Sequence, residues 1–513
     1  MNTFVYADTI DSISTYIKNG KIVPFADFLP DDDFKEIQPI DEKFNEYTDY
    51  AYGYSLKYPN HMQVDVSLSS VRTLIYDEDT RIEIYYDNFF DTHASTQAYI
   101  NYSNQFMKND KDHFKEYEAN VKVNDLNAHI LKWSREKLYR VKDDKNFYVS
   151  AEIAKNSHEV YTIFIKSAKP FENAESYMDI INSFRVVDRI GVPKSTARFA
   201  NKEKKLNEET EAFYNEYFLE SEDIKWGIFE YSAPKSFDFL HSLEKRVDYT
   251  FDFLVLYQSL SSSGFPMEEM ENAYKNNRYV ELTLQTMYLD GRDNSSIIYE
   301  ILKGQYDQYF YEYAQNLKKF GHPVLFRLNN EMNGDWCPYS NYYTSKDTEL
   351  FNQLWRYIYD IFEKNGVDNV LWVWNPHDGS FPNFKWNHYL TYYPGDEYVD
   401  IIGMTGYNAG TYYPGEKWRS FRDIYTPLYN EYMTYFEQPF MITEFGSNSV
   451  GGDKIMWIHE MFDLMKTMKN IKVAIWWNGI DWDKNMKPAR IYRLDESDTM
   501  LRTFEYRLRE YKK

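Results

Sequence analysis

The chain has 513 residues, 19% of them aromatic, and a formal net charge of -22 at pH 7. This length exceeds one ordinary hydrophobic core, so we expect at least two domains. The acidic balance argues against a nucleic-acid partner, because no basic excess is available to replace phosphate counterions. No apolar run approaches the roughly 18 residues of a membrane span. The first residues, "MNTFVYADTI", lack a basic and an apolar region, so we expect no signal peptide in this chain.

The amino-terminal part predicts a small domain without a catalytic constellation. Residues 1–45 are expected to form a leader, and residues 46–188 an α+β accessory domain. Alternating runs such as "RIEIYYDNF" and "EVYTIFIKSA" predict strands, whereas "ASTQAYINYSNQFMKN" has helical apolar spacing. This pattern distantly resembles PsbP/Mog1-like modules. It does not identify a binding partner for the domain. Residues 189–220 are interpreted as a linker followed by a connecting helix.

From residue 221 to residue 513 the sequence repeats a strand-then-helix unit. Continuous apolar runs of this kind are typical of parallel strands buried on both faces. The runs are 225–231, 251–257, 279–286, 323–328, 369–375, 399–407, 439–446 and 472–478. Eight such units predict the fold class α/β, with a (β/α)8 TIM barrel as the catalytic domain behind the smaller α+β domain. A doubly wound open sheet is the alternative, but it usually has fewer strands and often a Gly-rich phosphate turn, and none is visible here.

Polar and aromatic residues stand where the predicted strands end. In a TIM barrel these carboxyl ends form the active face, so we expect the residues to converge. They are Arg327, Asn330 and Glu331 at the end of the fourth strand, Trp374 and, just beyond, His377 at the fifth, Tyr407 at the sixth, Glu444 at the seventh, and Trp476 and Trp477 at the eighth. Glycoside hydrolysis needs two carboxyl groups, one as acid and one as nucleophile or base. Indoles suit the apolar faces of sugars, and carboxamides suit their hydroxyls.

Several segments resemble glycoside hydrolase family 26, which consists mainly of endo-β-mannanases. They include "EMNGDW" at 331–336, "VLWVWNPH" at 370–377 and "MITEFGS" at 441–447. The resemblance covers residues 221–513 and implies a retaining endo-β-glycanase that acts by double displacement. It also implies a secreted or cell-surface enzyme of polysaccharide degradation, with β-1,4-mannan as the default substrate.

The resemblance assigns roles residue by residue. Glu331 is similar to the family's general acid/base, and Glu444 to its nucleophile. Tyr407 resembles the tyrosine that holds the nucleophile. Arg327 and Trp336 match the family's arginine and active-site tryptophan. Trp476 or Trp477 would be the aromatic sugar-stacking residue on the eighth strand. Trp374 and His377 complete the expected substrate-binding residues.

One position departs from the family pattern. Mannanases of the family typically have histidine before the acid/base, and this chain has Asn330. Another β-glycan or a microbial exopolysaccharide therefore stays open as substrate. The alternative from a different functional class is a non-catalytic carbohydrate-binding barrel. Such barrels usually lose a catalytic carboxylate, however, and this chain retains both candidates. No metal-ligand cluster or nucleotide motif is visible, so we expect no metal and no cofactor.

Overall fold

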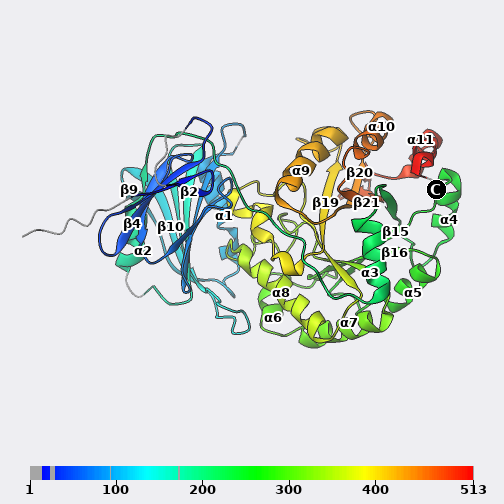
Figure 1. The fold of residues 1–513 in the computed structure, drawn as a ribbon, viewed down its shortest axis with the longest axis horizontal. Helices are drawn as coiled ribbons and strands as arrows, with labels where there is room; N and C mark the ends of the chain where they lie inside the picture. The colour runs from blue at the N-terminus through cyan, green and yellow to red at the C-terminus, as the bar shows by residue number, and fades with distance from the viewer. Residues whose placement is uncertain (1–13, 24–28, 93, 172–173, 512–513) are drawn as a thin grey trace, which may run out of the picture. The chain divides into compact units, whose positions relative to one another are not determined.

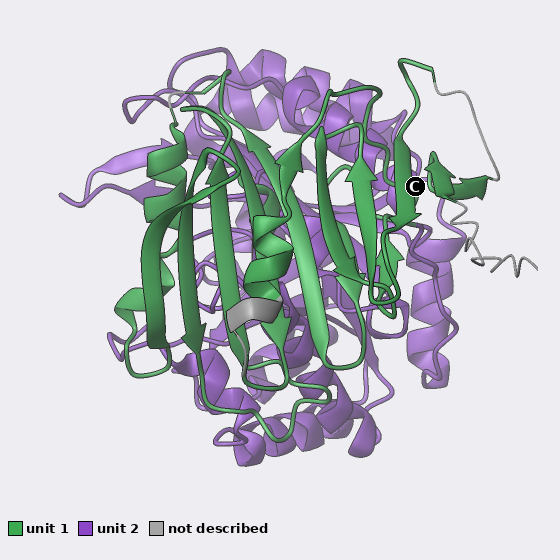
Figure 2. Ribbon diagram, turned by 90° about the vertical axis from the view of Figure 1, so that its left-hand side faces the viewer, with its two compact units in different colours: residues 1–197, 384–386 green, residues 198–383, 387–513 purple. Residues whose placement is uncertain are grey.

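The protein is described by a computed structural model that covers residues 14–23, 29–92, 94–171 and 174–511. The chain divides into two compact units, residues 1–197 with 384–386, and residues 198–383 with 387–513. Figure 2 distinguishes the two by colour. None of the described helices is both long and apolar enough to cross a membrane.

The first unit contains two antiparallel sheets. One has the strand order β13-β5-β4-β3-β1-β2, and the other β6-β7-β8-β12-β11-β10-β9. The strands are β1 (Thr15–Lys18), β2 (Lys21–Val23), β3 (Phe34–Pro39), β4 (Phe44–Asp49), β5 (Tyr54–Pro59), β6 (Gln63–Asp65), β7 (Thr73–Tyr76), β8 (Thr80–Asn88), β9 (Phe114–Val123), β10 (Leu126–Ser134), β11 (Phe147–Ala154), β12 (Glu159–Ser167) and β13 (Arg185–Val186). The helices are α1 (Thr96–Ser103) and α2 (Ala174–Asn182). Apolar side chains of both sheets, such as Leu56 and Ile130, share one buried core.

The described part of the expected leader differs from that expectation. Within residues 1–45 the chain forms β1, β2 and β3, and β3 pairs with β4 of the same sheet. Strands of this kind are stabilised by pairing with other segments, so a local sequence pattern marks them weakly. The expected linker, 189–220, is also divided, because the two units separate at residues 197 and 198. Residues 1–13 and 24–28 of the leader lie outside the described residues.

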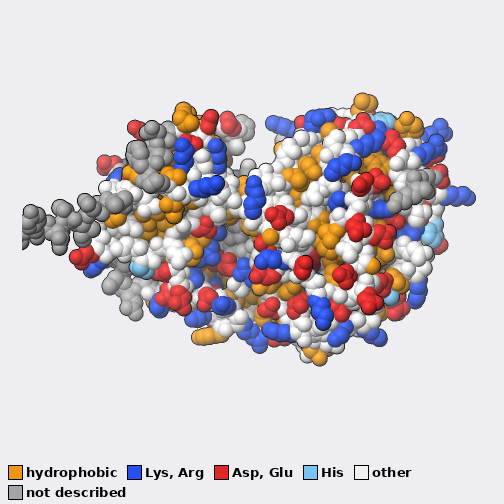
Figure 3. All heavy atoms as spheres, in the orientation of Figure 1, with side chains coloured by type: hydrophobic (Ala, Val, Ile, Leu, Met, Phe, Trp, Pro, Cys, Tyr) orange, Lys and Arg blue, Asp and Glu red, His pale blue; other side chains and the backbone are white. Residues whose placement is uncertain are grey.

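The described residues of the second unit form a closed barrel of eight parallel strands, as the sequence predicts. The strands are β14 (Lys225–Phe229), β15 (Phe253–Ser259), β16 (Tyr279–Gln285), β17 (Val324–Leu328), β18 (Val370–Trp374), β19 (Ile401–Asn408), β20 (Phe440–Ser447) and β21 (Ile471–Trp477). Figure 1 shows helices around the strands, and Figure 3 shows acidic, basic and apolar side chains interspersed on the visible face of this unit.

Helices connect most consecutive barrel strands. They are α4 (Asp238–Val247), α5 (Met267–Lys275), α6 (Ile297–Leu302), α7 (Asp307–Phe320), α8 (Thr348–Lys364), α9 (Phe421–Tyr435) and α10 (Lys454–Met465). Helix α11 (Asp498–Leu508) follows the last barrel strand. Short 3-10 turns replace the helix between β18 and β19. A small hairpin, β22 (Ile480–Trp482) and β23 (Pro488–Ile491), follows the last barrel strand.

One end of the barrel is filled by a helix that precedes the first strand. Helix α3 (Glu208–Tyr214) continues into a π-helical turn, Asn215–Leu219. Phe213 and Phe218 of this segment are buried in one cluster with Phe253, Leu325 and Leu371, which lie near the starts of their strands. The amino-terminal end of the barrel is therefore packed with apolar side chains, and the polar strand ends are at the opposite end.

Candidate active site

Glu444, on β20, is held by three hydrogen-bond donors from three other strands. Arg327 of β17 donates from Nη1 to Oε1 at 2.8 Å. The hydroxyl groups of Tyr257 on β15 and Tyr407 on β19 both donate to Oε2, at 2.6 and 3.0 Å. A carboxylate that receives charge-assisted hydrogen bonds is fixed in orientation and its negative charge is stabilised. The carboxyl group of Glu444 is thus held in one orientation at the barrel mouth.

Arg327 is fully buried and lies between two carboxylates. Its Nε is 2.5 Å from Oε1 of Glu281, whereas its Nη1 contacts Glu444. Nε also donates to the hydroxyl of Thr283 at 2.7 Å, and Nη1 to Oδ1 of Asn375 at 2.8 Å. Burial raises the pKa of Glu281 to about 7, although Arg327 opposes the shift. These contacts hold the guanidinium group in one orientation, directed at Glu444.

Glu331 follows β17 and stands in a different environment. Asn329 and Glu331 have φ values of 57° and 52°, the left-handed region, so the chain turns sharply as the strand ends. The indole Nε1 of Trp336 donates to Oε2 of Glu331 at 3.1 Å, and Nε2 of His377 lies 3.8 Å from Oε1. Burial raises the pKa of Glu331 to about 7; His377 opposes this shift, and the charge of Glu444 adds to it. Glu331 can therefore hold a proton near neutral pH.

Asn330 is buried beside Glu331 with its amide orientation defined by neighbours. Gln285, at the end of β16, donates from Nε2 to Oδ1 of Asn330 at 3.0 Å. The hydroxyl of Tyr339 donates to the same oxygen at 3.2 Å. The Nδ2 group of Asn330 is 3.5 Å from Oε2 of Glu331. Because the oxygen accepts from two donors, the amide presents its NH2 group towards the acid.

Aromatic rings stand on both sides of the two carboxylates. Trp336 is 46% exposed and packs against His377 and Phe381, with ring centroids 5.3 Å apart in each case. On the other side, Trp477 stacks on Phe229 at 5.3 Å and 10°, and its ring meets Tyr407 edge-on. Exposed or half-exposed indole faces beside paired carboxylates provide surfaces on which a sugar ring can stack.

Two tryptophans expected in the site do not line the mouth, and this corrects the sequence analysis. Trp374 is completely buried, donates to the carbonyl of Tyr392 and packs against Phe436. Trp476 is 1% exposed and packs against Trp457 of α10. Successive side chains of a strand point to opposite faces, so these two indoles face the surrounding helices. The structure brings together the other eight expected residues: Arg327, Asn330, Glu331, Trp336, His377, Tyr407, Glu444 and Trp477.

Two further residues, Tyr257 and Glu281, belong to the site by their contacts but were not predicted from the sequence. Tyr257 stands at the end of a predicted strand, and that position is the signal that could have singled it out. Glu281 is a charged residue within the apolar run "YVELTLQT", which is unusual for a strand buried on both faces. No group of three or more His, Cys, Asp or Glu side chains in the described part of the chain is arranged to hold a metal ion.

Comparisons with known proteins concern this barrel. The model of the family described as "Glycosyl hydrolase family 26" matches residues 280–486, a range that contains both Glu331 and Glu444. Endoglucanase H of Acetivibrio thermocellus is 35% identical over 199 residues, 37% of this chain and 22% of that protein. A mannan endo-1,4-beta-mannosidase of Bacillus subtilis is 30% identical over 238 residues, 45% of this chain and 56% of the relative.

The chain therefore spans about half or less of the length of these curated relatives. Among solved structures, the catalytic domain of an endo-β-1,4-mannanase from Bacillus sp. JAMB-750 is 19% identical, with a TM-score of 0.44 and coverage of 60% of this chain and 93% of that one. The barrel region of this chain is therefore similar to glycosyl hydrolase family 26 over residues 280–486.

Proposed function

We propose that the barrel is a retaining endo-β-glycanase that cleaves a β-linked polysaccharide by double displacement. One observation carries the proposal: two carboxyl groups at one barrel mouth have opposite environments. Glu444 accepts three hydrogen bonds, one from a cation, whereas Glu331 is buried with a pKa raised to about 7. Two carboxyl groups with different protonation states are what acid-assisted glycoside cleavage requires.

In the first step Glu444 attacks the anomeric carbon and forms a covalent glycosyl–enzyme bond. Glu331 gives its proton to the departing glycosidic oxygen, so the leaving sugar departs as a neutral alcohol. In the second step the Glu331 carboxylate takes a proton from water as that water attacks the anomeric carbon. The bond to Glu444 breaks, Glu444 leaves as a carboxylate, and Glu331 is again protonated.

The surrounding residues prepare these two groups. Arg327, Tyr257 and Tyr407 fix the carboxylate of Glu444 so that it need not reorient before attack. The NH2 group of Asn330 is placed to donate to a sugar hydroxyl next to the reacting carbon. Trp336 and Trp477 would support sugar rings on the two sides of the cleavage point.

β-1,4-Mannan is the first candidate substrate, because the Bacillus subtilis relatives are mannan endo-1,4-beta-mannosidases. A β-glucan is the second candidate. It is supported by the identity to Endoglucanase H and by asparagine at position 330, where mannanases of the family typically have histidine. Polysaccharides are too large to enter a cell intact, so we also propose that the enzyme acts outside the cell.

A reducing-end assay on mannan, glucomannan, mixed-linkage β-glucan and carboxymethylcellulose tests the function. We expect release of short oligosaccharides, with retention of configuration at the new reducing end detected by NMR. Inversion would contradict the nucleophilic role of Glu444. Inactivity on every β-glycan would contradict the proposed activity.

The variant Asn330→His separates the two substrate candidates. If the asparagine selects a sugar other than mannose, this variant should raise activity on mannan relative to β-glucan. A wild-type enzyme that already prefers mannan, with no gain in the variant, would leave mannan as the substrate. Gln285→Leu serves as the companion variant, because it removes one of the two donors to the side-chain oxygen of Asn330 without altering that residue.

A further inference from the structure

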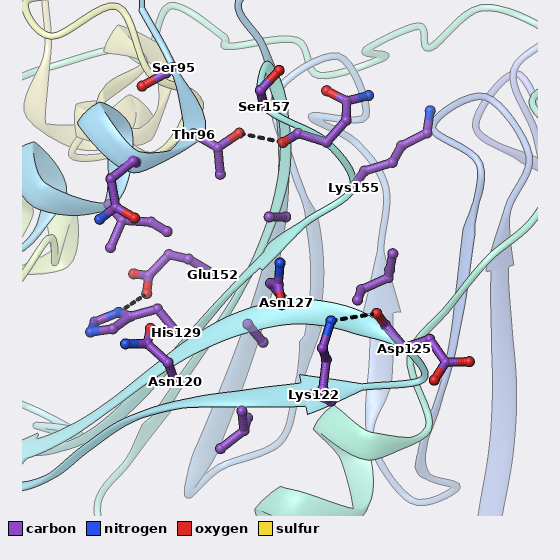
Figure 4. Close-up of a pocket in the computed structure, with 17 residues that line it drawn as sticks. Ser95, Thr96, Asn120, Lys122, Asp125, Asn127, His129, Glu152, Lys155 and Ser157 are labelled. Atoms are coloured by element: carbon purple, nitrogen blue, oxygen red, sulfur yellow. Dashed lines mark hydrogen bonds and ion pairs between the residues drawn. The ribbon is translucent and has the colours of Figure 1, made fainter.

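The first unit contains an open cavity that the proposed reaction does not use. Its volume is about 870 Å³, which falls in the range of small-molecule sites, roughly 300–1,000 Å³. It lies among the start of α1, the β9–β10 hairpin and the turn between β11 and β12. Figure 4 shows Ser95, Thr96 and Ser157 on one side of the opening and Asn120 and Asn127 on the other.

The charged side chains that line this cavity balance one another. Lys122 and Lys155 are offset by Asp125 and Glu152. Lys122 donates from Nζ to the backbone carbonyl of Asp125 at 3.1 Å, and Lys155 is paired with Glu159 at 2.9 Å. An anionic ligand would have to draw the two lysines from these partners, and a cationic ligand would meet as many basic as acidic side chains in the lining. The lining therefore favours a neutral ligand.

His129 does not change that conclusion. Its two ring nitrogens lie 2.8 Å from Oε2 of Glu152 and 3.1 Å from Oε1 of Glu118. Glu152 is itself fully buried and also accepts a hydrogen bond from the hydroxyl of Ser150. Both nitrogens are thus engaged by carboxylates, and the imidazole is a fixed part of the cavity wall.

The remaining groups match the chemistry of a sugar. Among the described residues, the side-chain amides of Asn120 and Asn127 form no hydrogen bond with another side chain, and each can both donate and accept, as a hydroxyl group does. Ile100, Val121 and Leu126 supply apolar surface for the C–H groups of a pyranose ring. No Phe, Tyr or Trp lines the cavity among the described residues, so a flat aromatic ligand would find no stacking partner. We propose that this cavity binds a neutral oligosaccharide through amide–hydroxyl hydrogen bonds.

Hydrogen exchange on the full chain tests this site separately from the barrel. The Glu444→Gln variant is used so that β-1,4-mannohexaose and cellohexaose remain intact. We expect one of these neutral sugars to slow amide exchange in peptides covering 120–129 and 152–157. Tetragalacturonic acid, the anionic comparator, should have no effect on these peptides. No slowing with either neutral sugar, or equal slowing with the anionic one, would overturn the proposal.

The double variant Asn120→Ala/Asn127→Ala should weaken binding at the cavity about tenfold, the scale of one or two lost hydrogen bonds. The matched control is Asn60→Ala, an exposed asparagine of the same unit outside the cavity. Unchanged protection in the double variant would reject the site. Peptides around 325–337 report the barrel independently, so loss of protection there alone would count against the proposed function and not against this cavity.

Discussion

Two buried glutamates, one in each unit, show how the same side chain acquires opposite properties. Glu83 of β8 is surrounded by three cations, with Lys166 at 2.9 Å, Arg72 at 3.0 Å and Arg81 at 3.6 Å. Glu331 at the barrel mouth has an indole donor at 3.1 Å and an imidazole at 3.8 Å. Burial favours a higher pKa for both groups. For Glu83 the three cations outweigh this effect and hold its pKa well below the usual range, whereas the pKa of Glu331 is raised.

The difference shows which buried carboxyl groups can take part in proton transfer and which only stabilise the fold. A carboxylate matched by cations is permanently ionised and serves the fold. A carboxyl group that is buried with few donors and a second carboxylate nearby titrates near neutral pH and can exchange a proton. This comparison can be tested, because substitution of Glu83 should affect stability, whereas substitution of Glu331 should affect the rate of hydrolysis.

The largest effect on hydrolysis is expected for Glu444→Gln. Without a nucleophile the covalent step is lost, and kcat should fall on the order of 10⁵-fold, the scale seen when a nucleophile is removed. The initial rate on a soluble oligosaccharide measures this loss. Glu437→Gln, an exposed glutamate of the same unit, is the matched control. Retention of more than a tenth of the activity in Glu444→Gln would refute the nucleophilic role.

Glu331→Ala is expected to cost about 10²–10⁴-fold in rate on oligosaccharides, the usual share of general acid catalysis. The loss should be smaller on an activated aryl glycoside, whose leaving group needs no proton. Because the pKa of Glu331 is about 7 and only the protonated form donates, wild-type activity should decline as pH rises through 7. Rate measurements across pH with both substrates check this. Equal losses on the two substrates would contradict the acid role.

Tyr257→Phe is expected to lower kcat roughly 10- to 100-fold, the scale of one hydrogen bond to a charged group. Arg327 and Tyr407 still hold Glu444 in this variant, so the loss should be smaller than for either glutamate. Tyr407→Phe removes the longer of the two tyrosine contacts and provides the comparison. A wild-type rate in Tyr257→Phe, with unchanged thermal unfolding, would show that this hydroxyl is dispensable.

Glu83→Gln is expected to have the smallest effect on hydrolysis and a large effect on stability. Three cations lose their buried partner, and breaking such a pair typically costs about 3–5 kcal/mol. Hydrogen exchange of β8 and β12 amides measures the local free energy of opening, while kcat on a short oligosaccharide measures the barrel. A fall in kcat without a change in hydrogen exchange would contradict the assignment of Glu83 to fold stability.

Much of the barrel could be predicted because its strands are long apolar runs. Each predicted run overlaps the observed strand, and Glu331 and Glu444 follow from their position at strand ends. Orientation was harder to predict. Trp374 and Trp476 stand at strand ends too, yet they face the helices, and the one-residue alternation that decides this cannot be read from an unbroken apolar run.

Other features depend on contacts between distant segments. The strands β1 to β3 exist through pairing within a sheet, so the leader interpretation had no local signal against it. Tyr257 is one of 49 tyrosines, and only its 2.6 Å contact with Glu444, 187 positions away, distinguishes it from a packing residue. Glu281 likewise gains its meaning from Arg327 on the next strand.

The Glu281–Arg327–Glu444 arrangement has a consequence for inhibition. Above pH 7, where Glu281 is ionised, one guanidinium group is shared by two carboxylates, so its positive charge does not cancel the negative charge of both. Positive charge that develops on the sugar ring in an oxocarbenium-like transition state would thus lie in a negative electrostatic potential. A ring of the same shape that carries a permanent positive charge, such as a protonated iminosugar, should therefore bind the mouth more tightly than the neutral sugar it imitates.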